Sequence, residues 1–227
     1  MRTIGQIADH LRGYRLTSRG ARTLSAVASA VLLAAVTPGI RADEPDAAAA
    51  LHALKVATTV CGTCHGRDGN STQPKFPRLA GQHANYLVAQ LKAFRAQTRG
   101  DPDAIGYMWG MSSELDDPTI AALATYYAAQ KPEPSTPGRS TLIATGRDIY
   151  EHGIPAEGVP ACSACHGPDA HGLQDYPRLA GQHSQYVLKQ LASFQSNMRN
   201  VAIMHGVAQN LRLAEMQAVA AYLESQP

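Results

Sequence analysis

The stretch Cys61-Gly-Thr-Cys64-His65-Gly66 recurs in this chain as Cys162-Ser-Ala-Cys165-His166-Gly167, 101 positions later. A second pair of matching segments follows at a spacing of 100: Phe76-Pro77-Arg78-Leu79-Ala80-Gly81-Gln82-His83 and Tyr176-Pro177-Arg178-Leu179-Ala180-Gly181-Gln182-His183. The similarity continues downstream, where Tyr86, Gln90, Leu91 and Phe94 match Tyr186, Gln190, Leu191 and Phe194. Repetition of this kind identifies one module used twice, with short loop deletions that explain the drift in spacing.

Both repeats carry the pattern C-x-x-C-H, which is the attachment signal of a c-type haem. Two cysteines one helical turn apart can form thioether bonds to the two vinyl groups of one haem, and the adjacent histidine then reaches the iron. We therefore expect two covalently attached haem c groups. The residues that would hold them are Cys61, Cys64 and His65 in the first module and Cys162, Cys165 and His166 in the second.

Two other kinds of site share the C-x-x-C pattern, namely redox-active dithiols and zinc sites. A thioredoxin-like dithiol needs a βαβ context, and the sequence has no such pattern. A zinc site would use the four cysteines across both modules and would leave the two histidines and the rest of the repeat without a purpose. Haem attachment is therefore the favoured interpretation.

A haem iron with one histidine ligand needs a sixth ligand or an open face, and methionine is the choice that suits electron transfer because it raises the potential. The later parts of the two modules align at a spacing of 96, which pairs Met108 with Met204 and Met111 with Val207. We therefore predict Met108 and Met204 as the sixth ligands, each in a loop before the last helix of its module. Met216 lies on the apolar face of that helix, where core packing is the favoured role.

Four further repeated residues are candidates for supporting roles. Pro77 and Pro177 follow the motif histidines by 12 and 11 positions, and a proline carbonyl in a rigid turn could accept a hydrogen bond from the second ring nitrogen of an axial histidine. Arg78 and Arg178 come next and could pair with haem propionates, with solvated surface arginines as the alternative.

The repeated histidines His83 and His183 offer bis-histidine ligation as an alternative to methionine. Each follows the Gly-Gln of its repeat and opens an amphipathic helix. A polar helix start or a contact between modules is the favoured explanation.

Helical periodicity marks the rest of each module. Leu87, Leu91 and Phe94 have the i, i+4, i+7 spacing of an amphipathic helix, and Asp117-Pro118 favours a helix start with aspartate at the N-cap. No segment alternates as a strand would. We predict an all-α fold with helices over residues 46–60, 83–97, 141–152, 184–196 and 213–225 and a further helix that begins at Asp117.

The first 42 residues have the features of an export signal. Five arginines and one acid lie in residues 1–23, and the apolar run over residues 24–36 has the length of a signal-peptide core and is short for a membrane span. We expect cleavage near Asp43, with an uncleaved anchor as the alternative.

Three prolines in residues 132–137 predict an extended linker. The predicted domains are a signal peptide (1–42), a first module (43–131), a linker (132–139) and a second module (140–227).

The charge distribution of residues 43–227 excludes a nucleic-acid-binding surface. Six of the 20 Lys and Arg residues and one of the 18 Asp and Glu residues lie in residues 1–42, so residues 43–227 hold 14 basic and 17 acidic groups. The basic groups form no continuous stripe.

A module of about 90 residues is too small to bury a large hydrophobic core with its side chains alone. A large apolar cofactor would add to that core.

In combination, the duplicated C-x-x-C-H, the two Pro-Arg-Leu-Ala-Gly-Gln-His segments and Val159-Pro160-Ala161-Cys162 resemble the cytochrome c4 family, over nearly all of residues 45–227. The resemblance implies two tandem class I cytochrome c domains, each all-α and wrapped on one haem with His/Met ligation. It implies a pseudo-twofold that brings the propionate edges towards the interface, and a periplasmic protein that is soluble or loosely attached to the membrane. Trp109, beside Met108, departs from the family pattern.

The predicted function is electron transfer without substrate turnover, so the chain is not expected to be an enzyme. It would take single electrons from a quinol-oxidising complex or a dehydrogenase and pass them to a terminal oxidase or a reductase. Two alternatives remain, a haem subunit of a larger periplasmic oxidoreductase and a di-haem peroxidase-like enzyme. A peroxidase needs an open or displaceable sixth position, whereas both modules offer a methionine there.

Overall fold

The computed structural model describes residues 47–134, 140–173 and 175–227. The predicted signal peptide, the cleavage point near Asp43 and most of the predicted linker lie outside the described residues. Helices make up nearly all the regular structure of the described part, which contains no strand and one isolated bridge between Ile154 and Val159. The prediction of an all-α fold is confirmed.

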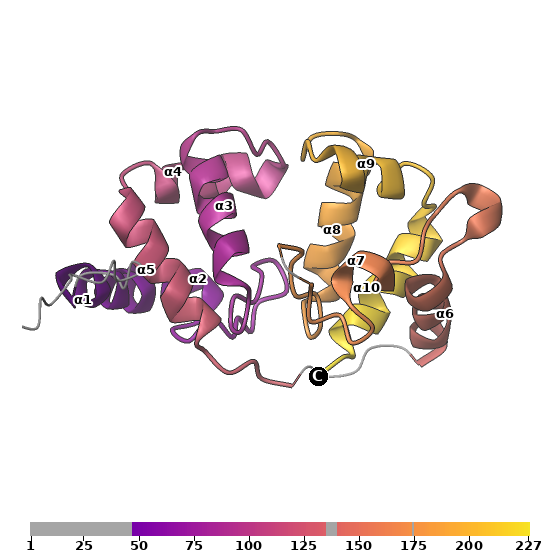
Figure 1. Ribbon diagram of the computed structural model, residues 1–227, viewed down its shortest axis with the longest axis horizontal. Coiled ribbons are helices and arrows are strands. Elements are labelled where there is room, and N and C mark those ends of the chain that lie inside the picture. Colours follow the sequence, from indigo (N-terminus) through magenta and orange to yellow (C-terminus); the bar gives the residue numbers. More distant parts are fainter. Residues whose placement is uncertain (1–46, 135–139, 174) are drawn as a thin grey trace, which may run out of the picture. The chain divides into compact units, whose positions relative to one another are not determined.

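The first half contains a discontinuous N-terminal helix, two long helices and the short turns between them (Figure 1). Its elements in chain order are α1 (Ala47–Val56), the π-helix η1 (Ala57–Cys61), α2 (Gly62–His65), α3 (Ala84–Arg95), the π-helix η2 (Ala104–Met108), α4 (Trp109–Ser112) and α5 (Asp117–Ala128). The predicted helix over residues 46–60 is therefore one α-helix that continues through a π-turn, and this turn ends at the first cysteine of the motif.

The second half repeats this order (Figure 1). Its elements are α6 (Ser140–His152), the 3-10 helix η3 (Pro155–Glu157), α7 (Ser163–His166), α8 (Ser184–Gln195), α9 (Ala202–Ala208) and α10 (Leu213–Glu224). Each half also ties its Pro-Arg-Leu segment to its last helix in the same way, because Gly81 N–H donates to the Tyr127 carbonyl and Gly181 N–H to the Leu223 carbonyl.

Each half has its own apolar core, built on the terminal helix. One face of α5 and one face of α10 are buried, with the side chains Ile120, Leu123, Ala124 and Tyr127 in α5 and Met216, Val219, Ala220 and Leu223 in α10. In the second half α6 crosses α10 closely. A Cβ at Gly146 would lie 2.0 Å from the Ala218 carbonyl oxygen, so only glycine fits at this crossing. The core-packing role expected for Met216 is confirmed.

Three local predictions need correction. The N-cap of α5 is Asp116, whose carboxylate accepts from the Thr119 N–H, so Asp117 is the first helical residue. Met108 closes η2 and Met204 lies within α9, so neither is in a loop. Both segments are short, and a period of 3.6 residues cannot be recognised over one or two turns.

Among the described residues, the helical run Ala47–His65 is the one stretch long and apolar enough to cross a membrane by length and composition. This run carries the first C-x-x-C-H motif, and α1 packs against α5. Soluble helices pass the same test, so the run is weak support for a membrane span.

Candidate haem sites

The two C-x-x-C-H motifs adopt the same local structure. Cys61 ends η1 and Cys64 lies in α2, while Cys162 caps α7 and Cys165 lies within it. None of the four forms a disulfide, and all four are half-buried. Burial raises the pKa of the Cys61 thiol and raises that of Cys162 to about 11, so both are neutral thiols before haem is attached. Four uncrosslinked thiols on single helical turns are what covalent attachment of two haems requires.

Each motif histidine is fixed by a proline carbonyl. His65 Nδ1 lies 2.9 Å from the Pro77 carbonyl oxygen, and His166 Nδ1 lies 3.1 Å from that of Pro177. A carbonyl only accepts, so Nδ1 carries the proton and Nε2 keeps its lone pair for a metal. Burial lowers the pKa of both rings, against an opposing effect of the proline carbonyls, so both are neutral as iron ligation demands. The hydrogen bond expected for each proline is present.

One large cavity adjoins both motifs. Its volume is about 770 Å³, its walls are mostly apolar, and it is bordered by all four motif cysteines, both motif histidines, Met108 and Met204. Cofactor pockets of proteins are typically about 300–1,000 Å³ and predominantly apolar. A flat hydrophobic ring system fits the walls, the thiols and the histidines present here.

The two aligned methionines occupy equivalent places at this cavity. Met108 and Met204 are both half-buried and line it. Met111 also lines it but is 58% exposed, and its aligned partner Val207 lines it too. The structure thus brings one repeated thioether and one repeated apolar side chain to each half of the cavity.

The segments that carry the methionines are anchored alike by different residues. Trp109 Nε1 donates to the Arg99 carbonyl at 2.8 Å, and His205 Nδ1 donates to the Phe194 carbonyl at the same distance. Trp109 and His205 are aligned at the spacing of 96. The bulky Trp109, which departs from the family pattern, therefore anchors the segment that carries Met108. Sequence reasoning missed this role because the two side chains share only a ring N–H.

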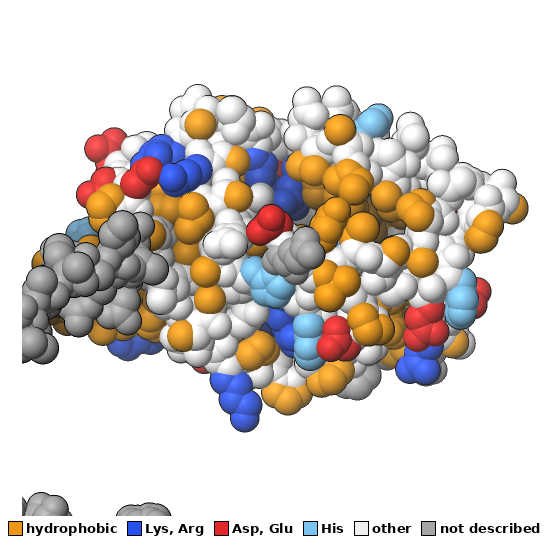
Figure 2. Space-filling model, in the orientation of Figure 1, with side chains coloured by type: hydrophobic (Ala, Val, Ile, Leu, Met, Phe, Trp, Pro, Cys, Tyr) orange, Lys and Arg blue, Asp and Glu red, His pale blue; other side chains and the backbone are white. Residues whose placement is uncertain are grey.

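The rim of the cavity is apolar and open to solvent. Its exposed residues include Ile105, Tyr107 and Met111 in the first half and Ile203 in the second, each at least 42% exposed. Figure 2 shows hydrophobic side chains gathered over α8 and α9 on the face in view. Exposed apolar patches rimmed by polar groups are typical of surfaces that meet another protein.

The Pro-Arg-Leu-Ala-Gly-Gln-His segments join the two halves. The side-chain amide of Gln82 accepts from Arg178 N–H and donates to the Arg178 carbonyl, both at 2.9 Å. Gln182 makes the same pair of hydrogen bonds with Arg78, at 2.8 and 2.9 Å. This role of the glutamines was not predicted, although their repetition was visible.

The arginine side chains of these segments contact backbone carbonyls. Arg78 donates to the Glu133 carbonyl at 2.9 Å, and Arg178 donates to the Pro227 carbonyl at 2.7 Å. Both arginines also border the large cavity. Pairing of these side chains with haem propionates stays a prediction.

The repeated histidines lie at the junction between the halves. His183 Nε2 donates to the Ser71 carbonyl at 2.8 Å, and a Cβ at Gly172 would lie 2.9 Å from the His83 ring. The expected contact between modules is confirmed for His183. Neither His83 nor His183 borders the cavity that holds the two motif histidines, which disfavours bis-histidine ligation.

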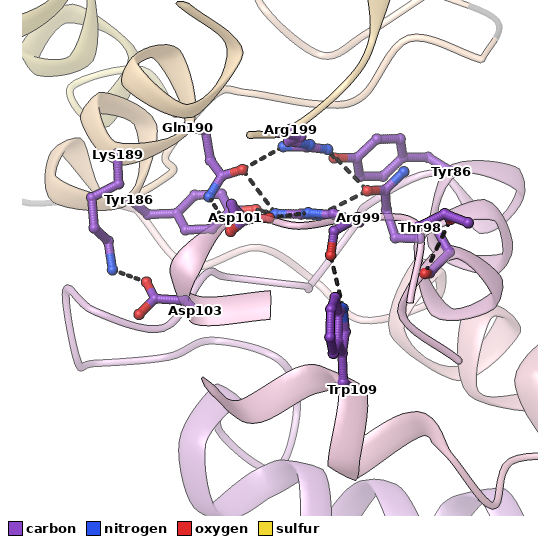
Figure 3. Close-up of polar contacts among 12 residues, drawn as sticks. Tyr86, Thr98, Arg99, Asp101, Asp103, Trp109, Tyr186, Lys189, Gln190 and Arg199 are labelled. Carbon is purple, nitrogen blue, oxygen red and sulfur yellow. Dashed lines mark hydrogen bonds and ion pairs between the residues drawn. The ribbon is translucent and has the colours of Figure 1, made fainter. Parts of the chain in front are cut away.

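A buried polar network crosses the junction beside the cavity (Figure 3). Arg99 donates to Gln90 and Gln190, both at 2.8 Å, and Arg199 donates to the same two oxygens at 2.9 and 2.7 Å. Each guanidinium also reaches a tyrosine of the other half, Arg99 to Tyr186 and Arg199 to Tyr86. Repetition of the tyrosines and glutamines was visible in the sequence, but their contacts with the two arginines were not predicted.

These features define a class of protein, the di-haem c-type cytochromes. The sequence model of the cytochrome c family, described as "Cytochrome c", matches residues 53–130 and 143–227, one match in each half. The chain belongs to this family, and its relatives place it in the cytochrome c4 group. It carries two covalently bound haem c groups, as members of that group do.

Three similar proteins illustrate the relationship. The cytochrome c4 of Azotobacter vinelandii is 40% identical over 178 residues, covering 73% of this chain and 83% of that protein. The solved structure of Acidithiobacillus ferrooxidans cytochrome c4 has a TM-score of 0.69 at 42% identity, covering 73% of this chain and 98% of that one. A thiosulfate dehydrogenase electron acceptor of Thiomonas intermedia is 35% identical over 174 residues, covering 74% of this chain and 78% of that protein.

Proposed function

We propose that this chain is an exported carrier of single electrons that works between a quinol-oxidising complex or dehydrogenase and a terminal oxidase or reductase. The observation that carries the proposal is the duplicated ligand set, a histidine fixed by a proline carbonyl and a half-buried methionine, both at one cavity. Haem bound here supplies one-electron chemistry at a potential raised by the thioether ligand.

The proposed ligands are His65 and Met108 for the first iron and His166 and Met204 for the second. The proposed attachment points are Cys61 and Cys64, and Cys162 and Cys165. A histidine and a methionine on each haem iron would leave no coordination position for a substrate, which disfavours the peroxidase-like alternative. The proposed domains are a signal peptide (1–42), modules over 43–131 and 140–227, and the linker 132–139.

The second candidate is a haem subunit of a larger periplasmic oxidoreductase. The relative from Thiomonas intermedia, described as a thiosulfate dehydrogenase electron acceptor, favours it. The two candidates share the same haem chemistry and differ in whether the chain stays bound to its electron donor. The open apolar rim of the cavity suits either a transient or a lasting partner.

Mass spectrometry and absorption spectroscopy of the exported protein test the proposal. We expect a chain that begins near Asp43, the added mass of two haems, low-spin bands, and the far-red band of methionine-ligated ferric haem. A resting high-spin spectrum with rapid peroxide turnover would overturn the carrier assignment in favour of an enzyme. Gel filtration of native extract separates the two candidates, because a carrier elutes alone and a subunit elutes with its dehydrogenase.

A further inference from the structure

A buried arginine begins each of the two segments that bring a methionine to the cavity. The first methionine segment covers residues 99–109 and begins at Arg99, and the second covers residues 199–205 and begins at Arg199. Each guanidinium stacks over a phenylalanine of its own half, Phe94 at 4.7 Å and Phe194 at 4.5 Å. A buried charge is costly without polar partners, so the hydrogen bonds of these two arginines constrain the position of both methionine segments.

Part of those hydrogen bonds cross the junction between the halves (Figure 3). Gln190 of α8 accepts from Arg99 at 2.8 Å, and Gln90 of α3 accepts from Arg199 at 2.9 Å. The Tyr86 hydroxyl of α3 also accepts from Arg199, at 2.8 Å. Each methionine segment is therefore held by a helix of the other half.

The first methionine segment is also held by an ion pair across the junction (Figure 3). Asp103 is the N-cap of η2, the turn that ends at Met108, and its carboxylate pairs with Lys189 of α8. In the same segment Asp101 accepts from Gln190 Nε2 at 3.1 Å. The turn that places the Met108 thioether thus begins at a residue fixed by the second half.

Hydrogen bonds inside each segment connect the arginine to the residues around the methionine. Trp109, the residue after the first methionine, donates to the Arg99 carbonyl at 2.8 Å. In the second segment the Arg199 carbonyl accepts from Val201 N–H at 3.1 Å, three residues before the methionine. The position of each methionine therefore depends on the arginine that begins its segment.

We infer that each half positions the methionine ligand of the other half, with Lys189 acting on Met108 and Tyr86 acting on Met204. The inference rests on the proposed methionine ligation and deepens it. The contacts across the junction exist only while the two halves are docked, so their loss lets the methionine leave the iron more often. Methionine ligation raises the potential of a haem, and docking of the halves therefore keeps both irons suited to electron transfer.

Two substitutions in the full-length haem-loaded protein test the inference, and each should act on the haem of the half that does not carry it. Lys189→Met, in the second half, removes the ion pair with Asp103 and keeps an apolar side chain of similar length. Tyr86→Phe, in the first half, removes the hydroxyl that accepts from Arg199 and keeps the ring. Lys189→Arg can still pair with Asp103 and should restore the behaviour of the unmodified protein.

The matched controls remove contacts that stay within the first half. Lys92→Met breaks the ion pair between Lys92 of α3 and Asp117 of α5. Tyr126→Phe removes a hydroxyl that donates to the Arg67 carbonyl at 2.8 Å. Neither contact crosses the junction, so neither variant should change how readily a methionine leaves its iron.

The measurement is the rate at which imidazole displaces the methionine from each ferric haem. At about pH 8 free imidazole is mostly neutral, so the charges removed by the substitutions do not attract or repel it. Loss of the far-red band gives the rates, and haem methyl NMR resonances assigned to each half show which haem has reacted. We expect Lys189→Met to raise the rate at the first-half haem by about threefold. Tyr86→Phe should raise the rate at the second-half haem by about tenfold, because hydrogen bonds to charged groups are the stronger ones.

A faster reaction in the half that carries the substitution, or an unchanged rate in either test variant, would overturn the inference. A merely structural role would lower the unfolding midpoint and accelerate both haems alike, which also contradicts it. So would controls as reactive as the test variants, or a Lys189→Arg protein as reactive as Lys189→Met. Failure of the proposed ligation is distinguishable, because the unmodified protein would then lack the far-red band before imidazole is added.

Discussion

Gln82 and Arg178 form a closed pair of hydrogen bonds across the junction of the two halves, with the side-chain amide of Gln82 pairing with the backbone N–H and carbonyl of Arg178. Gln182 and Arg78 form the same pair in the opposite sense. Both glutamines are buried, at 7% and 6% exposure. The backbone next to Pro77 and Pro177, which orients the axial histidines, is thus held by the other half of the molecule.

Replacing Gln82 by alanine should weaken the association of the halves. It leaves the backbone N–H and carbonyl of Arg178, which are half-buried, without these partners, and a fully buried group orphaned in this way costs about 1–3 kcal/mol. We expect a lower unfolding midpoint in denaturant, and Gln182→Ala should behave alike. Gln209→Ala, on an exposed residue at the end of α9, is the control and should change the midpoint little. Equal stability of Gln82→Ala and the control would mean that these hydrogen bonds contribute nothing.

Replacing the aligned methionines should change one haem at a time. Met108→Leu and Met204→Leu each remove a thioether from the cavity while keeping its volume, so the far-red band should fall by about half in each and vanish in the double variant. Met111→Leu is the matched control because Met111 borders the same cavity but is largely exposed. Loss of the band in Met111→Leu but not in Met108→Leu would reassign the ligand.

Much of this architecture could be predicted because the same module occurs twice in the sequence. The motif spacing identified the helical turns that carry Cys61 and Cys162, and the 3.6-residue period identified the face of α3 on which Leu87 and Phe94 are buried. The paired methionines followed from alignment of the repeats. What could not be predicted are contacts between distant segments, since nothing local in Gln82 or Arg99 indicates which backbone or side chain they meet.

The asymmetries were also invisible from the pattern alone. Asp101 accepts from Arg99 Nε, whereas the second half has Val201 at the spacing of 100, and Arg199 Nε is buried without a hydrogen-bond partner among the described residues. Similarly, Trp109 and His205 share no chemistry in the sequence, but both donate a ring N–H to a carbonyl that anchors the methionine segment.

The crossing of α6 and α10 should tolerate only glycine at position 146. In Gly146→Ala the new methyl group would lie 2.0 Å from the Ala218 carbonyl oxygen, so the helices must move apart. Overpacking of this kind costs about 1–3 kcal/mol or more. Gly206→Ala in α9, where a Cβ meets nothing within 4 Å, is the control. It should be neutral or slightly stabilising, since alanine favours helix. Matching midpoints in thermal unfolding for the two variants would show that the crossing is not tight.

Lowering the pH should destabilise the junction between the halves, because His183 becomes protonated. Burial lowers the pKa of this histidine, and the Arg78 charge adds to this while the Ser71 carbonyl and Glu224 oppose it. Because the folded state binds the proton less readily than the unfolded state, His183 favours folding above its unfolded pKa of about 6.5, and this contribution is lost as the pH falls below that value. His183→Gln can still donate to the Ser71 carbonyl but does not titrate. We expect the wild type to lose more stability than His183→Gln between pH 7 and about pH 5 in denaturant titrations. Parallel pH dependences in the two proteins would exclude His183 as the titrating group, and His152→Gln, at an exposed histidine of α6, should retain the wild-type dependence.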